Sequence, residues 1–333
     1  MKRRDFLRLL SLGGLVLGVP LIRLLPSEFP SSRMLQKSVY SMGTTVTISV
    51  EDTYDSNDLD TAVQNAFAGI TRMEGTLTHF DPNSQLSLLN KNGVLYDPSP
   101  ELLEAVQESL KLSETTEGTF DVTVQPALDL FTRFLSGGPD PTDADFAAAQ
   151  KLIDFEKLTA DQGGLTFATP GMGATLDGIA PGYILDKTAA SLKSSGVKSA
   201  LVQAGGTIVA IGARSDGSPW RIGVEDPMNG KATIGTLLLR DQAVATTGDY
   251  ENYFTPDKRY YHVVDPSTAR SPLYSHSATV VAPTCTVADS MGVVLMVQPP
   301  AEGLHTLDGV AGAECLIYTD SGTIVRSAGL VED

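Results

Sequence analysis

The chain has 333 residues, of which 42% are hydrophobic and 19% charged, and its formal net charge is −16. This length and composition are typical of a folded protein with one large or two modest domains, not of a disordered chain. The acidic excess argues against a nucleic-acid partner, because proteins that bind nucleic acids normally carry a basic surface.

The first 30 residues have the layout of an export signal. The pair Arg3-Arg4 is followed by Asp-Phe-Leu, and an apolar run then covers residues 9–22. This run is shorter than the roughly 20 apolar residues of a membrane span, and the arginine pair resembles the twin-arginine export signature. We expect an exported, periplasmic or extracytoplasmic protein in which residues 1–30 are either a cleaved signal or a retained membrane anchor. Residues 34–333 are expected to form one domain.

Two cysteines, Cys285 and Cys315, are present in the chain. In an oxidising compartment they are able to form one disulfide, and two buried thiols are an equal alternative. Their spacing fits no pattern of a metal site.

In chain order, period-two alternation first predicts a half-buried strand at residues 45–50. A helix is expected after Asp58, where apolar residues recur at helical spacing. A polar, turn-rich stretch follows. A second helix begins at Ser99-Pro100, with serine as N-cap and proline in the first turn. Thr142 and Asp145 resemble a capping box for a short helix that continues to Ile153.

Three glycine-rich or polar segments then suggest a ligand. Asp121 lies between apolar residues, so its carboxylate needs either a hydrogen-bonded structural partner or a ligand. Glycines at 178 and 182 bracket Pro181, which predicts a helix start suited to anion binding, although a plain strand–turn–helix joint needs similar residues. Residues 201–212 are expected to form one buried strand, interrupted at Gly205-Gly206 by a β-bulge or by a backbone wall against a ligand.

Polar side chains that are able to take part in binding or catalysis are frequent between Val244 and Pro272. It contains Thr246-Thr247, Asp249, His262 and Asp265 around a run at residues 260–264 that suits a strand. A packed structural histidine is the plain interpretation of His262, and a site residue is the alternative. Further strands are expected at residues 220–224, 236–240 and 278–282.

Residues 284–297 predict a buried helix in which Asp289 is the single charge. Such a carboxylate is paired, protonated or bound to a cation. The glycine-bracketed helix start, the hydroxyl-rich turn and this buried acid together suit a diphosphate ligand held by backbone N–H groups and by Mg²⁺.

These segments resemble the FAD:protein FMN transferases of the ApbE family over about residues 42–297. The resemblance rests on motifs in the same order and spacing, namely Met42-Gly43-Thr44, Ser84–Asn90, Gly118–Pro126, Gly178–Asp186, Gly205-Gly206, Ala245–Pro272, Pro283-Thr284 and Ala288-Asp289. It implies an α+β, T-fold-like architecture with two lobes, mixed or antiparallel sheets, flanking helices and a flavin site between the lobes. The implied reaction is Mg²⁺-dependent transfer of FMN from FAD to a Thr or Ser hydroxyl of an exported redox protein, with release of AMP.

The resemblance also implies roles for individual residues. Contacts with the flavin nucleotide are implied for Met42, Thr119, Phe120, Asp121, Thr175, Asp177, Pro181, Gly205, Gly206, Thr247, His262, Val263 and Val264. The metal is expected at Gly178, Thr286 and Asp289. His262 has the intrinsic pKa of a base near neutral pH, and Asp249 or Asp265 is expected to orient it. This catalytic role is a hypothesis, since a position near the flavin does not make a residue a base.

Several positions depart from the family's pattern. Pro181 stands where a lysine usually meets FAD, and Thr207 and Ala269 replace an aspartate and a glycine. An acid is absent at Thr175, although Asp177 is a candidate to replace it. Val293 stands four residues after Asp289, where the family has a metal-binding threonine; valine has nearly that shape but no oxygen. We expect FAD binding to survive these changes more readily than catalysis.

The leading hypothesis is therefore an exported flavin transferase. Its first rival is a FAD-binding protein of the same fold with weak or no transferase activity, and a second is a FAD pyrophosphatase in which water replaces the acceptor hydroxyl. A structural secreted domain is the last alternative, because it leaves the polar clusters without a cause.

Overall fold

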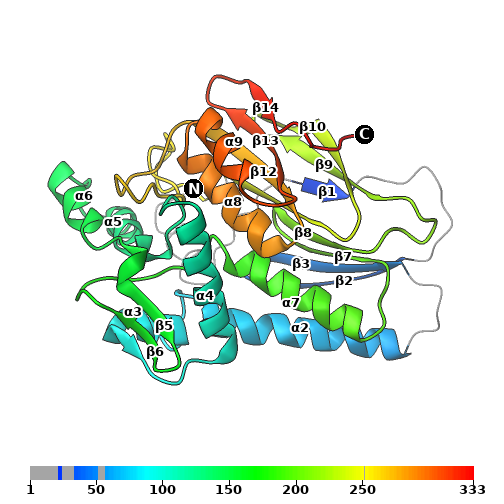
Figure 1. Ribbon diagram of the computed structural model, residues 1–333, viewed down its shortest axis with the longest axis horizontal. Helices are drawn as coiled ribbons and strands as arrows, with labels where there is room; N and C mark the ends of the chain where they lie inside the picture. Colours follow the sequence, from blue (N-terminus) through cyan, green and yellow to red (C-terminus); the bar gives the residue numbers. More distant parts are fainter. Residues whose placement is uncertain (1–21, 25–33, 52–56, 251) are drawn as a thin grey trace.

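An eight-stranded antiparallel sheet forms the middle layer of the fold, as the computed structural model of the chain shows (Figure 1). The structure describes residues 22–24, 34–51, 57–250 and 252–333. In sheet order the strands are β14 (Ile324–Arg326), β13 (Glu314–Thr319), β12 (Ser275–Ala282), β11 (Ala243–Gly248), β8 (Thr207–Ile211), β7 (Ala200–Ala204), β3 (Thr44–Glu51) and β2 (Met34–Ser41). The antiparallel sheet with its flanking helices confirms the predicted α+β class.

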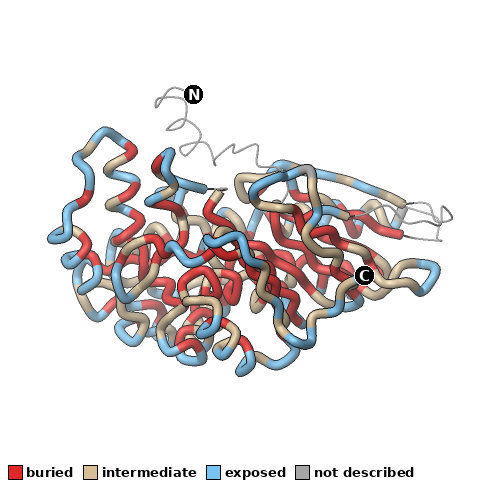
Figure 2. The backbone as a smooth tube through the Cα atoms, turned by 90° about the horizontal axis from the view of Figure 1, so that it is seen from above, coloured by how far each residue is buried: buried red, intermediate tan, exposed pale blue. Residues whose placement is uncertain are grey.

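Helices cover one face of this sheet, and the main apolar core lies between the two layers (Figure 2). These helices are α2 (Asn57–Leu77), α7 (Ala180–Ser194), α8 (Cys285–Val297) and α9 (Pro300–Asp308). The first turns of α7 and α8 are in close contact, because a Cβ atom on Gly182 would lie 2.4 Å from the Cys285 carbonyl oxygen. Only glycine permits this approach.

A three-stranded sheet covers the opposite face. Its strands are β1 (Ile22–Leu24), β9 (Trp220–Asp226) and β10 (Asn229–Leu239). Ile22 is fully buried in a second apolar cluster with Trp220, and it pairs with Val224. Strand β1 therefore lies inside the range predicted to be the export signal, while residues 1–21 and 25–30 of that range lie outside the described residues. None of the helices that the structure describes is long and apolar enough to cross a membrane.

Smaller elements complete the fold next to α2. They are α3 (Gln85–Asn92), β4 (Val94–Leu95), α4 (Pro100–Thr115), η1 (Val122–Val124), α5 (Gln125–Leu135), α6 (Asp143–Gln150), η2 (Phe155–Lys157), β5 (Leu158–Asp161) and β6 (Gly164–Phe167). Helices α5 and α6 project at one end of the molecule (Figure 1). The predicted N-cap at Ser99 and the capping box at Thr142 are confirmed, although α6 ends at Gln150 and not at Ile153. Helix α3, which Ser84 caps, overlaps the stretch at residues 80–90 that is predicted to be polar and turn-rich.

The prediction of one interrupted strand at residues 201–212 is wrong. Ala204 pairs with Thr207 across a tight turn made by Gly205-Gly206, so the segment is the β7–β8 hairpin. Gly205 has a φ of +55°, a left-handed conformation that glycine adopts without steric cost. The same glycine lies beside Thr44, so this hairpin turn is close to the turn that joins β2 to β3.

The strand expected at residues 260–264 is also absent from the described structure. The N–H of Tyr261 donates to the Ser271 hydroxyl, and among the described residues the segment pairs with another stretch of chain only at the isolated antiparallel bridge between Tyr253 and Tyr261. Its side chains still alternate as in a strand. Tyr260 stacks on Phe131 of α5 with ring centroids 4.8 Å apart, whereas Tyr261 packs into the main core.

Both cysteines are buried free thiols. Of the two alternatives, a disulfide or two buried thiols, the structure has the two buried thiols. Burial raises the pKa of Cys285 well above its ordinary value, which keeps this thiol protonated and unreactive.

Replacing Ile22 by Ala should lower the free energy of unfolding by about 2–4 kcal/mol, because it leaves a cavity beside Trp220. Chemical denaturation of the purified full chain measures this loss. Leu273→Ala, at a side chain that is 65% exposed, is the control and should change stability by less than about 0.5 kcal/mol. Equal effects of the two substitutions would show that β1 is not packed in solution.

Candidate active site

A row of titratable side chains, namely Asp289, Asp177, His262 and Asp249, runs from the α7–α8 contact to the end of β11. Asp177, in the turn before α7, acts electrostatically both on Asp289 of α8 and on His262. Asp249, directly after β11, also acts electrostatically on His262. The structure therefore brings together four predicted site residues that lie as much as 112 positions apart in the sequence.

At one end of the row, the Asp289 Oδ2 atom accepts a hydrogen bond from the Gly182 N–H at 3.0 Å. Burial raises the pKa of Asp289 to about 7, and the negative charges of Asp186 and Asp177 act in the same direction. Asp186 in turn accepts from the N–H and hydroxyl groups of Thr286, at 2.8 and 2.7 Å, and from the N–H of Cys285 at 2.8 Å. It thereby caps the N-terminus of α8.

The predicted metal ligands fit a hard cation only in part. Asp289 is a carboxylate among other carboxylates, and the Gly178 carbonyl lies on the same side of α8, where it accepts from the Ser290 hydroxyl at 3.2 Å. The hydroxyl hydrogen of Thr286 is donated to Asp186, which leaves that residue only its oxygen lone pairs. A Val293 methyl lies 3.0 Å from where a Cβ on Gly178 would be, so Val293, one turn after Asp289, presents a carbon and not an oxygen to Gly178.

Within the described residues, no group of three or more His, Cys, Asp or Glu side chains is arranged to hold a metal. Two protein oxygen donors with several waters are nonetheless an ordinary set for Mg²⁺, which keeps much of its hydration shell. The residues therefore fit a water-rich magnesium site better than a closed one.

His79 is a site residue that the sequence reasoning missed. Its Nε2 atom lies 2.9 Å from Asp177 Oδ2, and its side chain is 14% exposed. Burial opposes protonation, but the Asp177 carboxylate outweighs it and raises the pKa of His79. Burial likewise opposes ionisation of Asp177, but the His79 interaction and the Thr175 hydroxyl hold the pKa of Asp177 below its usual range. Each of the two groups thus favours the charged form of the other.

In this structure neither Asp249 nor Asp265, the residues expected to orient His262, is hydrogen-bonded to its ring. The carboxylate of Asp249 binds Lys258 at 3.0 Å and His276 Nδ1 at 2.7 Å. The Asp265 carboxylate is occupied within its own turn by the N–H and hydroxyl groups of Ser267 and by Thr268. The Nδ1 atom of His262 is buried and has no hydrogen-bond partner among the described residues. Burial lowers the pKa of His262, so its ring is neutral at pH 7.

Asp121 has the structural partner that its burial requires. Its carboxylate accepts from the Thr123 N–H and hydroxyl at 2.7 and 2.6 Å and from the Phe155 N–H at 2.9 Å. Beside it, Phe120 is buried and its ring lies 3.4 Å from where a Cβ on Gly178 would be. Thr119 Oγ1 accepts from Gln298. Of the three residues, Phe120 is thus the one that lies against Gly178.

Met42 occupies the β2–β3 turn with a φ of +52°, which is unusual for a residue with a side chain. The Glu74 carboxylate of α2 holds it there by accepting from the Met42 N–H at 2.7 Å and from the Ser41 hydroxyl. Glu74 is a second residue that the sequence reasoning missed. A strained backbone held from two sides is common at ligand sites, and the predicted flavin role of Met42 stays a prediction.

The remaining predicted flavin residues are placed as follows. The Thr175 hydroxyl accepts from the Asp177 N–H at 3.2 Å, and Pro181 lies in the first turn of α7, as expected. Thr247 is buried against Gly292 of α8. Val263 and Val264 are buried in two different apolar clusters, so their side chains belong to the core and only their backbone is free for a ligand.

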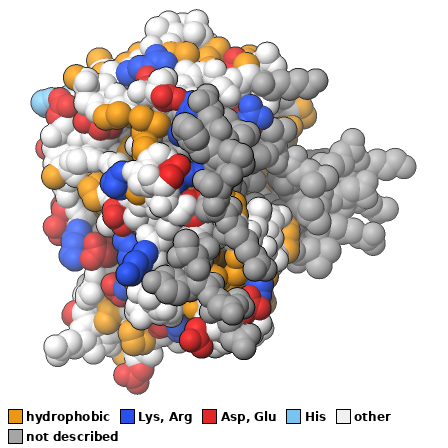
Figure 3. All heavy atoms as spheres, turned by 90° about the vertical axis from the view of Figure 1, so that its right-hand side faces the viewer, with side chains coloured by type: hydrophobic (Ala, Val, Ile, Leu, Met, Phe, Trp, Pro, Cys, Tyr) orange, Lys and Arg blue, Asp and Glu red, His pale blue; other side chains and the backbone are white. Residues whose placement is uncertain are grey.

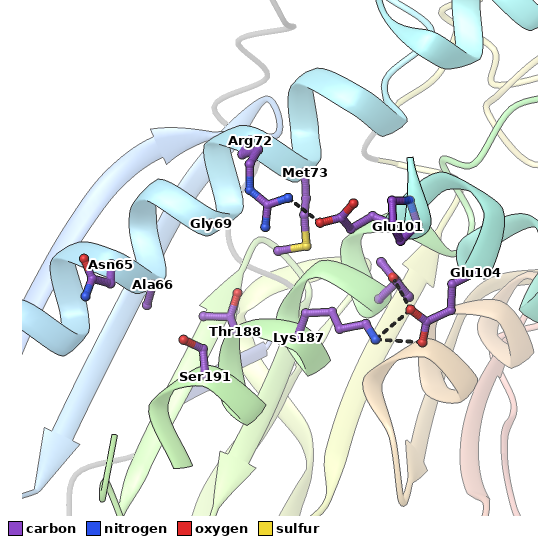
Figure 4. A pocket seen from close by; sticks show the side chains of 12 residues that line it. Asn65, Ala66, Gly69, Arg72, Met73, Glu101, Glu104, Lys187, Thr188 and Ser191 are labelled. Atoms are coloured by element: carbon purple, nitrogen blue, oxygen red, sulfur yellow. Dashed lines mark hydrogen bonds and ion pairs between the residues drawn. The ribbon is translucent and has the colours of Figure 1, made fainter. Parts of the chain in front are cut away.

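A pocket of about 360 Å³ lies elsewhere, between α2, α4 and α7 (Figure 4). Its charged side chains bind one another: Arg72 pairs with Glu101, and Lys187 pairs with Glu104 at 2.7 Å. None of the predicted site residues lines this pocket. We therefore do not assign the flavin to it.

The fold and the titratable residues at the α7–α8 contact together point to one class of protein, the flavin transferases. The chain belongs to the ApbE family, whose pattern matches residues 42–317. It is 33% identical over 258 residues to the FAD:protein FMN transferase of Vibrio cholerae, which covers 75% of this chain and 76% of that protein. The Haemophilus influenzae FAD:protein FMN transferase is 28% identical over 313 residues, with 89% and 90% covered.

Solved structures agree with these relatives. The ApbE protein of Thermotoga maritima superposes with a TM-score of 0.80 at 28% identity, covering 89% of this chain and 97% of that one. The flavin transferase ApbE of Vibrio cholerae gives a TM-score of 0.78 at 28% identity, with 90% and 98% covered. The resemblance seen in the sequence motifs is thus confirmed for both family and fold.

Gly182→Ala should destabilise the protein by more than about 3 kcal/mol, because the new methyl group would collide with the Cys285 carbonyl and force α7 from α8. Gly75→Ala in α2 is the matched control. No atom lies within 4 Å of its added Cβ, so it should stabilise the helix by up to about 1 kcal/mol. Thermal unfolding distinguishes the two, and a tolerated Gly182→Ala would contradict the close helix contact.

Asp121→Ala should lower the free energy of unfolding by about 2–4 kcal/mol, because two N–H groups and one hydroxyl lose their acceptor. Urea denaturation measures the change. Asp121→Asn keeps one acceptor oxygen and should lose less. If both variants were as stable as the unmodified chain but failed to bind FAD, the carboxylate would be a ligand contact and not a structural one.

Proposed function

We propose that this chain is a FAD:protein FMN transferase. The observation that carries the proposal is the row Asp289–Asp177–His262, which family-typical motifs bring together at the α7–α8 contact. In the reaction, a Thr or Ser oxygen of an acceptor protein forms a bond to the FMN-side phosphorus of FAD. The bond from that phosphorus to the bridging oxygen breaks, AMP leaves, and the hydroxyl proton passes to a base.

The work of this chain in such a transfer is positioning and charge control. Asp289 and the Gly178 carbonyl would hold Mg²⁺, which when bound neutralises the diphosphate. The neutral ring of His262 suits a base that accepts the hydroxyl proton. The backbone at the Met42 turn and at Gly205-Gly206 supports one wall of the flavin pocket.

We also propose that the protein acts outside the cytoplasm on a redox protein that is exported or membrane-associated. Support comes from the twin-arginine-like start, and residues 1–30 would serve as signal or as anchor. A nucleic-acid partner is not proposed, because the chain is strongly acidic. On the described part of the face seen in Figure 3, acidic and basic side chains are interspersed.

A second candidate is FAD binding with weak transfer, or hydrolysis of FAD to FMN and AMP. Val293 favours it, because this side chain, which lies against Gly178 one turn after Asp289, has no oxygen to offer a metal. Weaker metal binding would impair the chemical step more than it impairs flavin binding.

The deciding assay incubates the purified full chain with FAD, Mg²⁺ and an acceptor domain of the kind that ApbE-family transferases modify. Intact mass spectrometry should show the acceptor gaining the mass of FMN, together with free AMP. AMP without modified acceptor would establish hydrolysis, and bound FAD without either product would leave only the binding role.

Val293→Thr should tighten Mg²⁺ binding roughly tenfold, because threonine has nearly the same shape and adds a hydroxyl oxygen beside Gly178. Isothermal titration of the FAD-loaded protein with Mg²⁺ measures the affinity. Val293→Ala removes the methyl groups without adding oxygen and should not tighten binding. Equal affinities for all three proteins would place the metal elsewhere.

A further inference from the structure

The turn between β2 and β3 contains a residue that its own backbone geometry disfavours. Ser41 pairs with Thr44 across this turn. Between them, Met42 and Gly43 have φ angles of +52° and +69°. A two-residue hairpin turn with both angles positive normally has Asn, Asp or Gly in its first position, because bulkier side chains are crowded there. The methionine at this place therefore needs a reason beyond reversal of the chain.

Glu74 of α2 holds this turn in its conformation. Its Oε1 atom accepts a hydrogen bond from the Met42 N–H at 2.7 Å, and its Oε2 atom accepts one from the Ser41 hydroxyl. Both oxygens of one carboxylate are thus directed at a single turn, from a helix position 32 residues further along the chain. A tertiary contact, and not a local preference, therefore stabilises the left-handed backbone of Met42.

The turn that Glu74 holds lies next to other predicted site residues. A Cβ atom on Gly205 would lie 3.6 Å from Thr44 Oγ1, so the β7–β8 turn adjoins the β2–β3 turn. The chain that leaves α2 places His79 Nε2 2.9 Å from Asp177 Oδ2. The end of α2 that carries Glu74 therefore leads directly to the turn before α7.

The Met42 side chain packs against the main core but is only partly buried. A thioether is polarisable and flexible, and it makes favourable contacts with aromatic rings. The ring system of a flavin is such a partner. Backbone strain that the surrounding structure holds in place is typical of ligand sites, and here it is found at a side chain suited to a flat aromatic ligand.

We propose that Glu74 is a positioning residue of the flavin site, which fixes the left-handed backbone of Met42 before FAD arrives, so that this side chain is already placed against the flavin ring. The inference rests on the proposed function, because it takes FAD as the ligand. Glu74 itself does not touch FAD. Without its carboxylate, only a fraction of the molecules has the turn in the binding conformation, and the apparent FAD affinity falls by that fraction.

The test measures the FAD affinity of the purified full chain by quenching of flavin fluorescence. Glu74→Ala should lower the affinity about tenfold, the loss expected if about one molecule in ten keeps the turn. Glu74→Gln retains an oxygen for the Met42 N–H and should recover most of the affinity. Gly75→Ala, at the next position of α2, is the matched control and should leave the affinity unchanged, because no atom lies within 4 Å of the added Cβ.

A second comparison separates positioning from a general loss of stability. Met42→Gly removes both the side chain and the steric cost of the left-handed turn. In this background, Glu74→Ala should lower the FAD affinity by less than about twofold, because glycine adopts the turn without help. A tenfold loss in both backgrounds would overturn the proposal, as would an unchanged affinity of Glu74→Ala in the otherwise unmodified chain.

If Glu74→Ala does not fold, Glu74→Asp takes its place. It keeps the charge but withdraws the carboxylate from the Met42 N–H by one methylene group, so the same loss of affinity is expected and a retained affinity would overturn the proposal. The measurement needs no turnover. A chain that binds FAD but transfers no FMN therefore still tests the role of Glu74 and counts only against the proposed transfer, whereas an unmodified chain that binds no FAD would overturn both.

Discussion

The contact between the first turns of α7 and α8 is the constraint on which the site depends. Gly182 lets the two helices approach closely, and Asp186 of α7 then caps the N-terminus of α8. The same contact places the Gly182 N–H on Asp289 and brings the Gly178 carbonyl beside α8. One steric condition thus fixes the cap, the buried acid and the carbonyl next to it. A shift of either helix would separate all three.

Local signals in the sequence were sufficient for much of the fold. The caps at Ser99 and Thr142, the helix after Asp58 and the helix that Pro181 opens all follow from short-range rules, and the structure has them. The predictions of local structure fail where tertiary contacts determine the hydrogen bonding of a segment. Residues 260–264 alternate like a strand because two apolar clusters lie on either side of them. Their pairing nevertheless stops at the single bridge between Tyr253 and Tyr261, since the Tyr261 N–H donates to the Ser271 hydroxyl.

The sequence predicted which residues lie in the site better than it predicted the hydrogen bonds and ion pairs between them. Sequence motifs selected Asp177, His262 and Asp289, which the structure brings together. The partner of Asp177 was not predictable, because His79 lies 98 positions away in a stretch that has the composition of a plain turn. Likewise, nothing local distinguishes an Asp249 that serves His262 from one that binds Lys258 and His276. A signal existed in hindsight: three of the four histidines of the chain are involved in this region.

Strand β1 has a consequence for how the protein behaves in concentrated solution. It covers the backbone edge of β9, pairing along residues 222–224 and shielding an apolar cluster around Trp220. Processing that removed Leu24 and everything before it would leave that edge with unpaired N–H and carbonyl groups. Such an edge recruits any extended segment available, including one from a second copy of the same chain. Loss of β1 from the sheet would therefore favour self-association through β9.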